Sequence, residues 1–314
     1  GGCGINIASW FEQFKGKDDI STIEVCYLDT SEANLKRVDS VDTYLVKGGS
    51  SGSGKIQRTN LEPIRESVCD MLVKFPPAQL NIVISSASGG SGSVINILLV
   101  KELLAQDQNV VTFLVGSTGS AIEIDNTTFT IRSYERAAKD SGKPIVCHYL
   151  ENGVDGGRTE VNTRVHKAIV RLAGLFASSN EEIDATDLRN FLDYTKHSKT
   201  PPHMVALEFG SGQLKDAPYG RIIAVATLAH RDQEAEIEAF VDYHTTGVIS
   251  DDTAAHLQLT EPLHFVIIEG LVEEVYQKIA ERQASVEKAR KARIDNNKSL
   301  SRDASGENDT GLIV

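Results

Sequence analysis

The stretch "LNIVISSASGGSGSVINILLVKELLA", residues 80–105, joins an apolar strand to an apolar helix through a loop of glycines and serines. "LNIVIS" predicts a buried strand, because its apolar residues do not alternate with polar ones. In the loop, glycines let the backbone approach an anion, serines add hydroxyl donors, and the helix N-terminus adds partial positive charge. We interpret it as a phosphate-binding loop; a tight strand–helix turn is the alternative. Its residues are Ser88, Gly89, Gly90, Ser91, Gly92 and Ser93.

Composition limits the function classes. The chain has 314 residues, 40% hydrophobic and 24% charged, as in an ordinary soluble globular protein. Its longest apolar runs, such as Val94–Val100, are too short to span a bilayer. The formal net charge of −12 argues against direct nucleic-acid binding. The four cysteines are scattered, which fits a reducing cytoplasm and argues against a zinc site or a disulfide framework.

Strands and helices alternate along the first half of the chain. Strands are expected at 21–29, 41–46, 80–85, 109–116 and 143–150, with helices at 5–14, 60–74, 94–105 and 126–139. This order predicts an α/β fold with a parallel sheet, helices on both faces and a ligand site at the carboxyl ends of the strands. A long helix at 160–177 follows. Strands are then expected at 203–209, 221–230 and 263–270, with polar helical segments between them, such as 232–243, and a long charged helix from Leu271.

Two other glycine-rich stretches invite comparison with known nucleotide loops. "GSSGSGK", Gly49–Lys55, matches most of a Walker A motif, but Ile56 stands where that motif needs serine or threonine to hold magnesium. We therefore expect a surface loop, or a lid over a phosphate bound elsewhere. The opening "GGCGIN" resembles a second strand–helix turn, and we expect a strand to precede it. With Asp29 at the end of the next expected strand, it leaves a Rossmann NAD site as an alternative, although the third Rossmann glycine is absent.

Four motifs together resemble the tubulin/FtsZ superfamily. They are "GGCGIN" (1–6), "LDTSEANL" (28–35), "SGGSGS" (88–93) and "NEEIDATDLRNFL" (180–192). Their order and spacing agree with that family along nearly the whole chain, and the short length and acidic tail are similar to its bacteriophage branch. The resemblance implies a parallel-sheet GTP-binding domain (1–159), a long central helix (160–178), a smaller α/β activation domain (179–270), a long C-terminal helix (271–295) and an extended acidic tail (296–314).

The resemblance also implies roles for individual residues. GTP or GDP would be held with Mg²⁺, and residues 48–54 would form the lid that senses the γ-phosphate. Asp29 and Ser31 fall where the family handles magnesium or that phosphate, with Asp29 as the metal residue and Glu32 able to compensate for Ser31. Asn152 and Asn162 lie where ribose and guanine contacts are expected, and Arg158 or Val161 stands where the family usually stacks an aromatic ring on guanine. The remaining binding residues are those of the first loop, Gly2, Cys3, Gly4 and Asn6, and of the phosphate loop, Ser88–Ser93.

Asp184 and Asp187 are the candidate catalytic residues. Three positions apart at a helix start, they share one face, although N-capping is the alternative explanation. The helix before them, of about 17 residues, spans about 25 Å and starts on the nucleotide side, so the acids should lie far from their own nucleotide. They could instead orient water against the nucleotide of the next subunit in a head-to-tail filament, with Glu182 as a weaker candidate.

The resemblance implies a filament-forming GTPase in the bacterial host cytoplasm that positions phage DNA. Its expected partner is itself, in a head-to-tail homopolymer, with the acidic tail docked on the adjacent subunit; no membrane partner is expected. Two alternatives stay open: an NAD-binding Rossmann oxidoreductase, and a nucleotide-binding regulator that neither polymerises nor hydrolyses.

Overall fold

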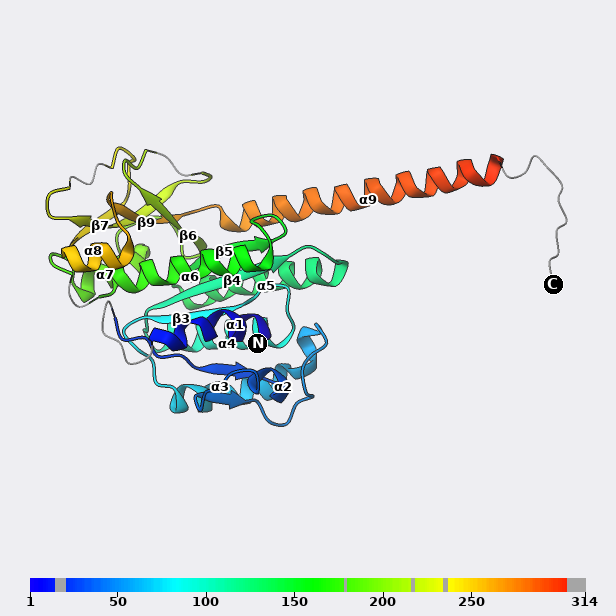
Figure 1. The fold of residues 1–314 in the computed structure, drawn as a ribbon, viewed down its shortest axis with the longest axis horizontal. Coiled ribbons are helices and arrows are strands. Elements are labelled where there is room, and N and C mark those ends of the chain that lie inside the picture. Colours follow the sequence, from blue (N-terminus) through cyan, green and yellow to red (C-terminus); the bar gives the residue numbers. More distant parts are fainter. Residues whose placement is uncertain (15–20, 178–179, 216–217, 234–236, 304–314) are drawn as a thin grey trace. The chain divides into compact units, whose positions relative to one another are not determined.

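A seven-stranded sheet organises the chain (Figure 1). The computed structural model describes residues 1–14, 21–177, 180–215, 218–233 and 237–303. Its contacts divide the chain into one unit from Gly1 to Val272 and another from Glu273 to Val314.

The strands of the main sheet lie in the order β3-β4-β5-β6-β9-β7-β8, and β9 runs antiparallel to both of its neighbours while the other pairs are parallel. A separate parallel pair joins β1 (Tyr27–Asp29) to β2 (Thr43–Leu45). The strands of the main sheet are β3 (Asn81–Ser86), β4 (Val110–Ser117), β5 (Ile145–Asn152), β6 (Met204–Ser211), β7 (Ile222–His230), β8 (Tyr243–Ile249) and β9 (Leu263–Ile268).

Helices connect most of these strands. Short 3-10 segments lie at Ser9–Phe14, Gln57–Asn60 and Tyr194–Lys196. The α-helices are α1 (Gly2–Ala8), α2 (Glu32–Leu35), α3 (Leu61–Lys74), α4 (Ser91–Ala105), α5 (Ala121–Ser141), α6 (Arg158–Leu175), α7 (Ala185–Leu192), α8 (Asp251–Leu257) and α9 (Leu271–Asp303). The predicted α/β class, with its largely parallel sheet, is confirmed, whereas the division into domains stays a prediction.

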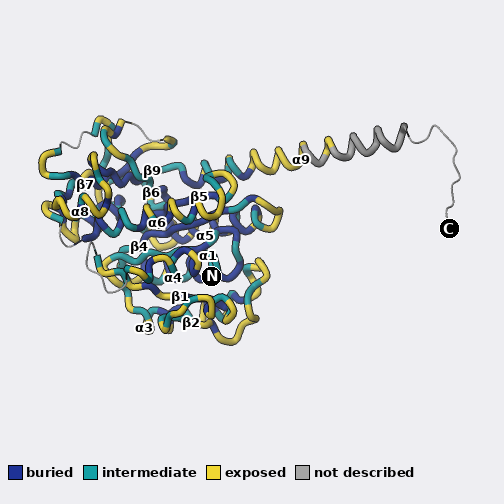
Figure 2. Tube along the Cα trace, viewed as in Figure 1, coloured by how far each residue is buried: buried dark blue, intermediate teal, exposed yellow. Residues whose placement is uncertain are grey.

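The core follows the period of each element. Alternate residues of β4, Val111, Phe113 and Val115, share one buried cluster with α1 and with the apolar stripe of α6. In that stripe Val161 and Leu172 are fully buried. Each such side chain contributes about 1.5–3 kcal/mol on burial, so the stripe fixes α6 against the sheet. Figure 2 shows buried residues concentrated along the central strands.

On the other side of the sheet, α4 is apolar around most of its circumference because it is covered from several directions. It contacts β3, α3 and α5. Ile95 and Leu99 belong to a second buried cluster with Ile64 and Met71 of α3. The start of α4 is thereby held rigidly at the carboxyl end of β3.

One expectation from the sequence is wrong, and one strand was missed. Alanine and glutamate near residues 232–243 favour helix locally, but the described part of this segment forms no helix; the Glu238 amide donates to the Leu214 carbonyl at 3.0 Å. The strand β8, which begins at Tyr243, was not expected at all. Long-range pairing overrides local propensity in both places.

The second unit consists of α9 from Glu273 onward. The helix continues to Asp303 rather than ending near residue 295. Two i,i+4 ion pairs, Lys278 with Glu274 at 3.3 Å and Lys291 with Glu287 at 3.0 Å, support it. The last part of the expected acidic tail, residues 304–314, lies outside the described residues. Across the described residues, no helix combines the length and apolar character that crossing a membrane requires.

Candidate functional site

Two glycine-rich turns meet at the carboxyl end of β3. The helix α1 begins at Gly2, and α4 begins at Ser91 with Gly90 as its N-cap. A Cβ atom added to Gly92 would lie 3.1 Å from the Cα of Gly1, and one added to Gly4 would lie 2.2 Å from the carbonyl oxygen of Ile84. The backbones therefore pack with no room for side chains. Two helix N-termini, whose first N–H groups have no intrahelical partner, converge where a phosphate group would be stabilised.

The two glycine-rich turns, residues 1–6 and 88–93, together form a cradle, and hydroxyl groups line this cradle in two different ways. The Oγ1 of Thr30 lies 2.6 Å from the Oγ of Ser91, and this contact joins the loop after β1 to the start of α4. The Oγ of Ser93 instead donates to the carbonyls of Gly89 and Gly90, at 2.8 and 2.9 Å. Ser93 therefore shapes the turn of the phosphate loop, whereas Ser91 connects the phosphate loop to the loop that carries Thr30.

The Walker-like stretch lies over the phosphate loop. The Oγ of Ser53 accepts a hydrogen bond from the Ser91 amide at 3.0 Å, and a Cβ on Gly90 would lie only 2.7 Å from the Cβ of Ser53. Asn60 braces this lid, accepting from the Ser50 amide at 2.9 Å and donating to the Gly52 carbonyl at 3.2 Å. The serine hydroxyl thus takes a helix N-terminal N–H group that an anion could otherwise take.

Lys55 does not face the cradle as a Walker lysine would. Its Nζ pairs with the Oε1 of Glu123 at 2.6 Å, and its backbone has a left-handed φ of 67°. The hydrogen bond from Lys55 is the largest cause of the lowered pKa of the Glu123 carboxyl. Ser117 also lowers this pKa, whereas burial opposes the shift. The lid is therefore anchored to the start of α5.

Gln57 and Asn126 close the network behind the lid. The Nε2 of Gln57 lies 3.0 Å from the Oγ of Ser93 and 2.9 Å from the Oγ1 of Thr130. The Nδ2 of Asn126 donates to the carbonyls of Lys55 and Ser88, at 2.7 and 3.1 Å. Movement of the lid is thereby coupled to the phosphate loop and to α5.

Asp29 is buried and held by its own loop. Its Oδ1 accepts from the amides of Thr30 and Ser31, at 2.7 and 3.2 Å, and its Oδ2 accepts from the Nδ2 of Asn34 at 2.8 Å. Within the described residues, no group of three or more histidine, cysteine, aspartate or glutamate side chains could hold a metal ion. A single carboxylate beside a phosphate cradle fits Mg²⁺ that is held mainly by phosphate oxygens and water. Ser31 is the N-cap residue of α2, beside Glu32 in its first turn.

The end of β5 adds a second polar group. Glu151 is buried, and its Oε1 accepts from the Oγ1 of Thr118 at 2.6 Å. The Oδ1 of Asn152, the next residue, is buried and has no hydrogen-bond partner. Such an orphaned acceptor is costly unless a ligand pairs with it, so Asn152 fits a hydroxyl or amino group of a nucleoside.

The other predicted binding residues are spread around this edge. Cys3 is partly exposed by surface area, and burial raises the pKa of its thiol to about 11, so it is a neutral lining group. Asn6 is exposed, and Asn162 is half-buried on the first turns of α6. The structure therefore brings the two glycine loops and the lid together closely, and places Asn6 and Asn162 further along α1 and α6.

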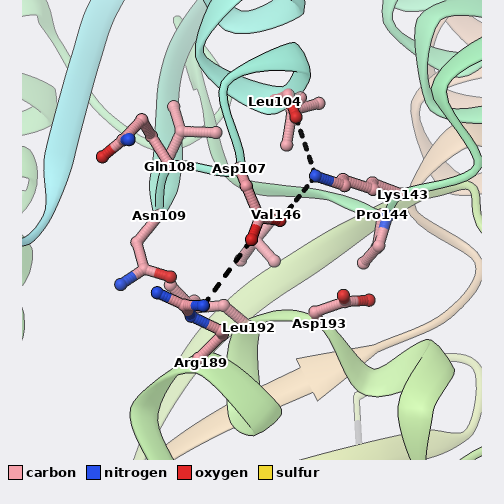
Figure 3. A pocket seen from close by; sticks show the side chains of 11 residues that line it. Leu104, Asp107, Gln108, Asn109, Lys143, Pro144, Val146, Arg189, Leu192 and Asp193 are labelled. Carbon is pink, nitrogen blue, oxygen red and sulfur yellow. Dashed lines mark hydrogen bonds and ion pairs between the residues drawn. The ribbon is translucent and has the colours of Figure 1, made fainter. Parts of the chain in front are cut away.

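Asp184 and Asp187 lie at the opposite ends of the strands. The turns that precede β4 and β5 share a shallow pocket with α7 (Figure 3). There Asp107 lies 2.7 Å from the Nζ of Lys143 and 3.6 Å from the Nη1 of Arg189. These residues mark the amino edge of the parallel strands, whereas the phosphate loop follows the carboxyl end of β3. The central helix α6, with 18 residues and a length of about 27 Å, joins the two edges.

The two acids form a reciprocal capping box. The Oδ1 of Asp184 accepts from the amides of Thr186 and Asp187, at 2.6 and 3.0 Å, and the Oδ2 of Asp187 accepts from the Asp184 amide at 3.1 Å. These amides, that of Asp187 first, lower the pKa of the exposed Asp184 carboxyl. The capping alternative is thus realised, and it leaves both carboxylates at the surface end of α7.

Comparisons with known proteins show what the chain as a whole is similar to. No family model matches the chain. A phage tubulin-like protein of Pseudomonas phage phiKZ is 26% identical over 303 residues, covering 92% of this chain and 89% of the relative. A phage tubulin-like protein of Pseudomonas phage PhiPA3 is 26% identical over 267 residues, covering 85% and 84%. The solved protofilament of TubZ from bacteriophage PhiKZ superposes with a TM-score of 0.76 at 25% identity, over 100% of this chain and 92% of that one. In sequence and fold the chain is similar to the phage tubulins of the tubulin/FtsZ superfamily.

A second structure of this superfamily, the phage tubulin PhuZ with GDP, has a TM-score of 0.80 at 24% identity and covers 100% of this chain and 93% of its own. The resemblance seen in four sequence motifs is confirmed. The Rossmann oxidoreductase alternative loses its basis, since the matches extend over the whole tubulin-like fold.

Several polar residues of this tubulin-like site escaped the sequence reasoning. They reach the site through contacts between residues distant in the chain, so local spacing carries no sign of them. Only Glu151 had a usable signal, as an acid at the carboxyl end of an apolar strand. The residues are Gln57, Asn126, Glu151 and Tyr243, and the hydroxyl of Tyr243 lies 3.0 Å from the Oδ1 of Asp187.

Proposed function

We propose that the chain is a filament-forming phage GTPase. In this proposal the acidic loop of one subunit, which carries Asp184 and Asp187, completes the nucleotide site of the next. One observation carries the proposal: the glycine cradle and the two acids lie at opposite edges of the same sheet, joined by α6. A single subunit cannot bring them together. Repeated head-to-tail contact brings each cradle to the acids of a neighbour and, if the ring does not close, generates a filament.

Guanine nucleotide is the proposed ligand because the related phage tubulin PhuZ was solved with GDP. The amides of the first loop and of α4 would hold the phosphates, and Asn152 and Glu151 would meet the nucleoside. For those amides to bind the terminal phosphate, the Ser53 hydroxyl has to leave the Ser91 amide. Mg²⁺ would supply charge neutralisation at the phosphates, with Asp29 beside it.

Asp184 and Asp187 are the proposed water-positioning residues. A carboxyl whose pKa is lowered, as that of Asp184 is, is a weak proton acceptor but a good hydrogen-bond acceptor. Phosphoryl transfer depends mainly on positioning and electrostatic stabilisation, so aligning the attacking water is a sufficient role. Hydrolysis would then begin only on assembly.

The cellular role rests on likeness to phage proteins. Relatives come from Pseudomonas phages, and PhiKZ TubZ and PhuZ201 were solved as a protofilament and a filament. We propose a cytoskeletal role in the cytoplasm of an infected bacterium, positioning phage DNA. The acidic tail, with Asp303, Glu307 and Asp309, would dock on a basic patch of the adjacent subunit.

The test is hydrolysis measured against protein concentration. The wild type should show a threshold in light scattering and phosphate release on adding GTP. Asp187→Ala should keep GTP affinity and lower hydrolysis roughly 10²–10⁴-fold, with longer-lived filaments. Asp252→Asn, which alters an exposed acid in the first turn of α8, is the control and should change neither.

The outcomes separate the candidates. GTP binding without a threshold would favour the non-polymerising regulator. Hydrolysis by dilute subunits at the full rate would contradict the shared site, and equal hydrolysis by Asp187→Ala would remove that residue from the mechanism.

A further inference from the structure

Tyr243 holds one of the two candidate catalytic acids. It is the first residue of β8, and its hydroxyl donates to the Oδ1 of Asp187 at 3.0 Å. The other oxygen of that carboxylate accepts the Asp184 amide at 3.1 Å. Both oxygens of Asp187 are therefore engaged, and the plane of the carboxylate is fixed. We propose that Tyr243 is a positioning residue for hydrolysis, aligning Asp187 for the nucleotide of the neighbouring subunit; this rests on the proposed function.

The whole acidic loop is shaped by the same edge strand. Glu181 exchanges two backbone hydrogen bonds with Val248 of β8, both of 2.9 Å. A Cβ on Gly247 would lie 2.9 Å from the Cγ2 of Ile183, so the strand and the loop pack without a gap. Between these contacts Glu182 has a left-handed φ of 66°, a conformation that surrounding contacts must maintain. Tyr243 is thus the last of three attachment points, and the one that reaches a candidate catalytic side chain.

The ring of Tyr243 is itself oriented. His197 stacks on it with a centroid distance of 4.8 Å and an interplanar angle of 26°. Burial, then the hydrogen bond and charge of Asp187, raise the pKa of the Tyr243 hydroxyl, so it stays protonated and able to donate at neutral pH. A neutral donor orients the carboxylate and leaves its negative charge in place, whereas a lysine or an arginine would neutralise that charge.

Tyr243→Phe tests this role because it removes the hydroxyl and keeps the stacked ring. Hydrolysis per assembled subunit should fall about tenfold, equivalent to about 1.4 kcal/mol in the barrier. The KM for GTP should stay unchanged, as should the critical concentration for assembly with a slowly hydrolysed GTP analogue. Tyr194→Phe is the matched control: it removes a nearby tyrosine hydroxyl that is bonded to the Pro201 carbonyl at 3.1 Å and to His203, not to an acid. It should leave hydrolysis unchanged.

A double-mutant cycle separates positioning from general bracing, because the Tyr243 hydroxyl also interacts with Asn190 and Thr245. With radiolabelled GTP, adding Tyr243→Phe to Asp187→Ala should cost nothing further. A further tenfold loss in that background would overturn the proposal, and so would a Tyr243→Phe enzyme as fast as the wild type.

The contact can be measured apart from hydrolysis. In the full chain without nucleotide, the ¹³Cζ resonance of Tyr243 should shift in Asp187→Asn and not in Asp252→Asn; an unshifted resonance overturns the contact. A wild type without an assembly threshold would instead refute the proposed function, and the positioning role with it. A wild type with a threshold that Tyr243→Phe matches would refute the positioning role alone.

Discussion

Replacing Gly4 with alanine should push α1 away from β3. The added Cβ would lie 2.2 Å from the carbonyl oxygen of Ile84, about 0.8 Å less than the 3.0 Å below which real Cβ contacts essentially never fall. Both sides of this contact are backbone, and Ile84 belongs to a strand of the central sheet, so no side chain can rotate away. Gly2 offers the comparison: there an added Cβ would meet the side chain of Asn34, whose Nδ2 would be the nearest atom at 3.3 Å.

The magnitude follows from two opposing effects. Overpacking in a well-ordered interior costs about 1–3 kcal/mol, and a contact this short between fixed backbones belongs at or above the upper end. Alanine is favoured over glycine within a helix by about 1 kcal/mol, which offsets part of that cost. The free energy of unfolding should therefore fall by about 2 kcal/mol in Gly4→Ala. In Gly2→Ala it should stay unchanged or rise by less than about 1 kcal/mol.

Urea unfolding without nucleotide measures both variants against the wild type. Binding of a fluorescent GTP derivative should also weaken in Gly4→Ala, because α1 carries half of the cradle. A Gly4→Ala protein as stable as Gly2→Ala would refute the described packing of α1 on β3. If the stability fell but GTP affinity did not, the first loop would have no part in binding nucleotide.

Three further predictions concern the core, the lid and the tail. Burial lowers the pKa of His148 to about 4, whereas the unfolded chain binds the proton near pH 6.5; stability is therefore complete above that pH and should fall by about 2 kcal/mol by pH 5. Denaturation of His148→Gln should show a shallower fall, and equal slopes would contradict this. Gln57→Ala should speed GDP release roughly fivefold, as expected for losing about 1 kcal/mol of hydrogen bonding. Gln108→Ala, which loses a hydrogen bond to the Gln106 carbonyl, should not speed it; equal release rates in the two variants would exclude a clamping role for Gln57. Deleting Asp303–Val314 should raise the critical concentration for assembly, with a smaller difference at high salt, and an unchanged value would exclude tail docking.

The first half of the fold was predictable because its signals are local. Apolar runs of strand length, helical stripes and turn residues alternate from residue 80 to residue 175, and each buried element carries its own periodicity. The error at residues 232–243 and the missed strand β8 have one cause. Glutamate and alanine favour a helix there, whereas "YHTTGVI" shows no clear alternation, and its place beside β7 depends on residues far along the chain.

The candidate site was predictable only where backbone makes it. Glycine loops reveal themselves in sequence, since a close approach of two chains needs glycine, and their meeting at Gly1 and Gly92 follows from the fold. The lid contact of Ser53 and the contact of Tyr243 with Asp187 depend on side chains separated by tens of residues. Such pairs become visible only when the sheet brings their elements together.

The placement of cradle and acids at opposite edges has an arithmetic consequence. If subunits stack as proposed, every filament ends on one side with a cradle that no neighbour covers. That last subunit keeps its triphosphate intact however long the filament grows. The number of uncleaved nucleotides would thus equal the number of such filament ends and not depend on the number of subunits. Breaking filaments by shear would raise the number of uncleaved nucleotides in proportion to the number of breaks.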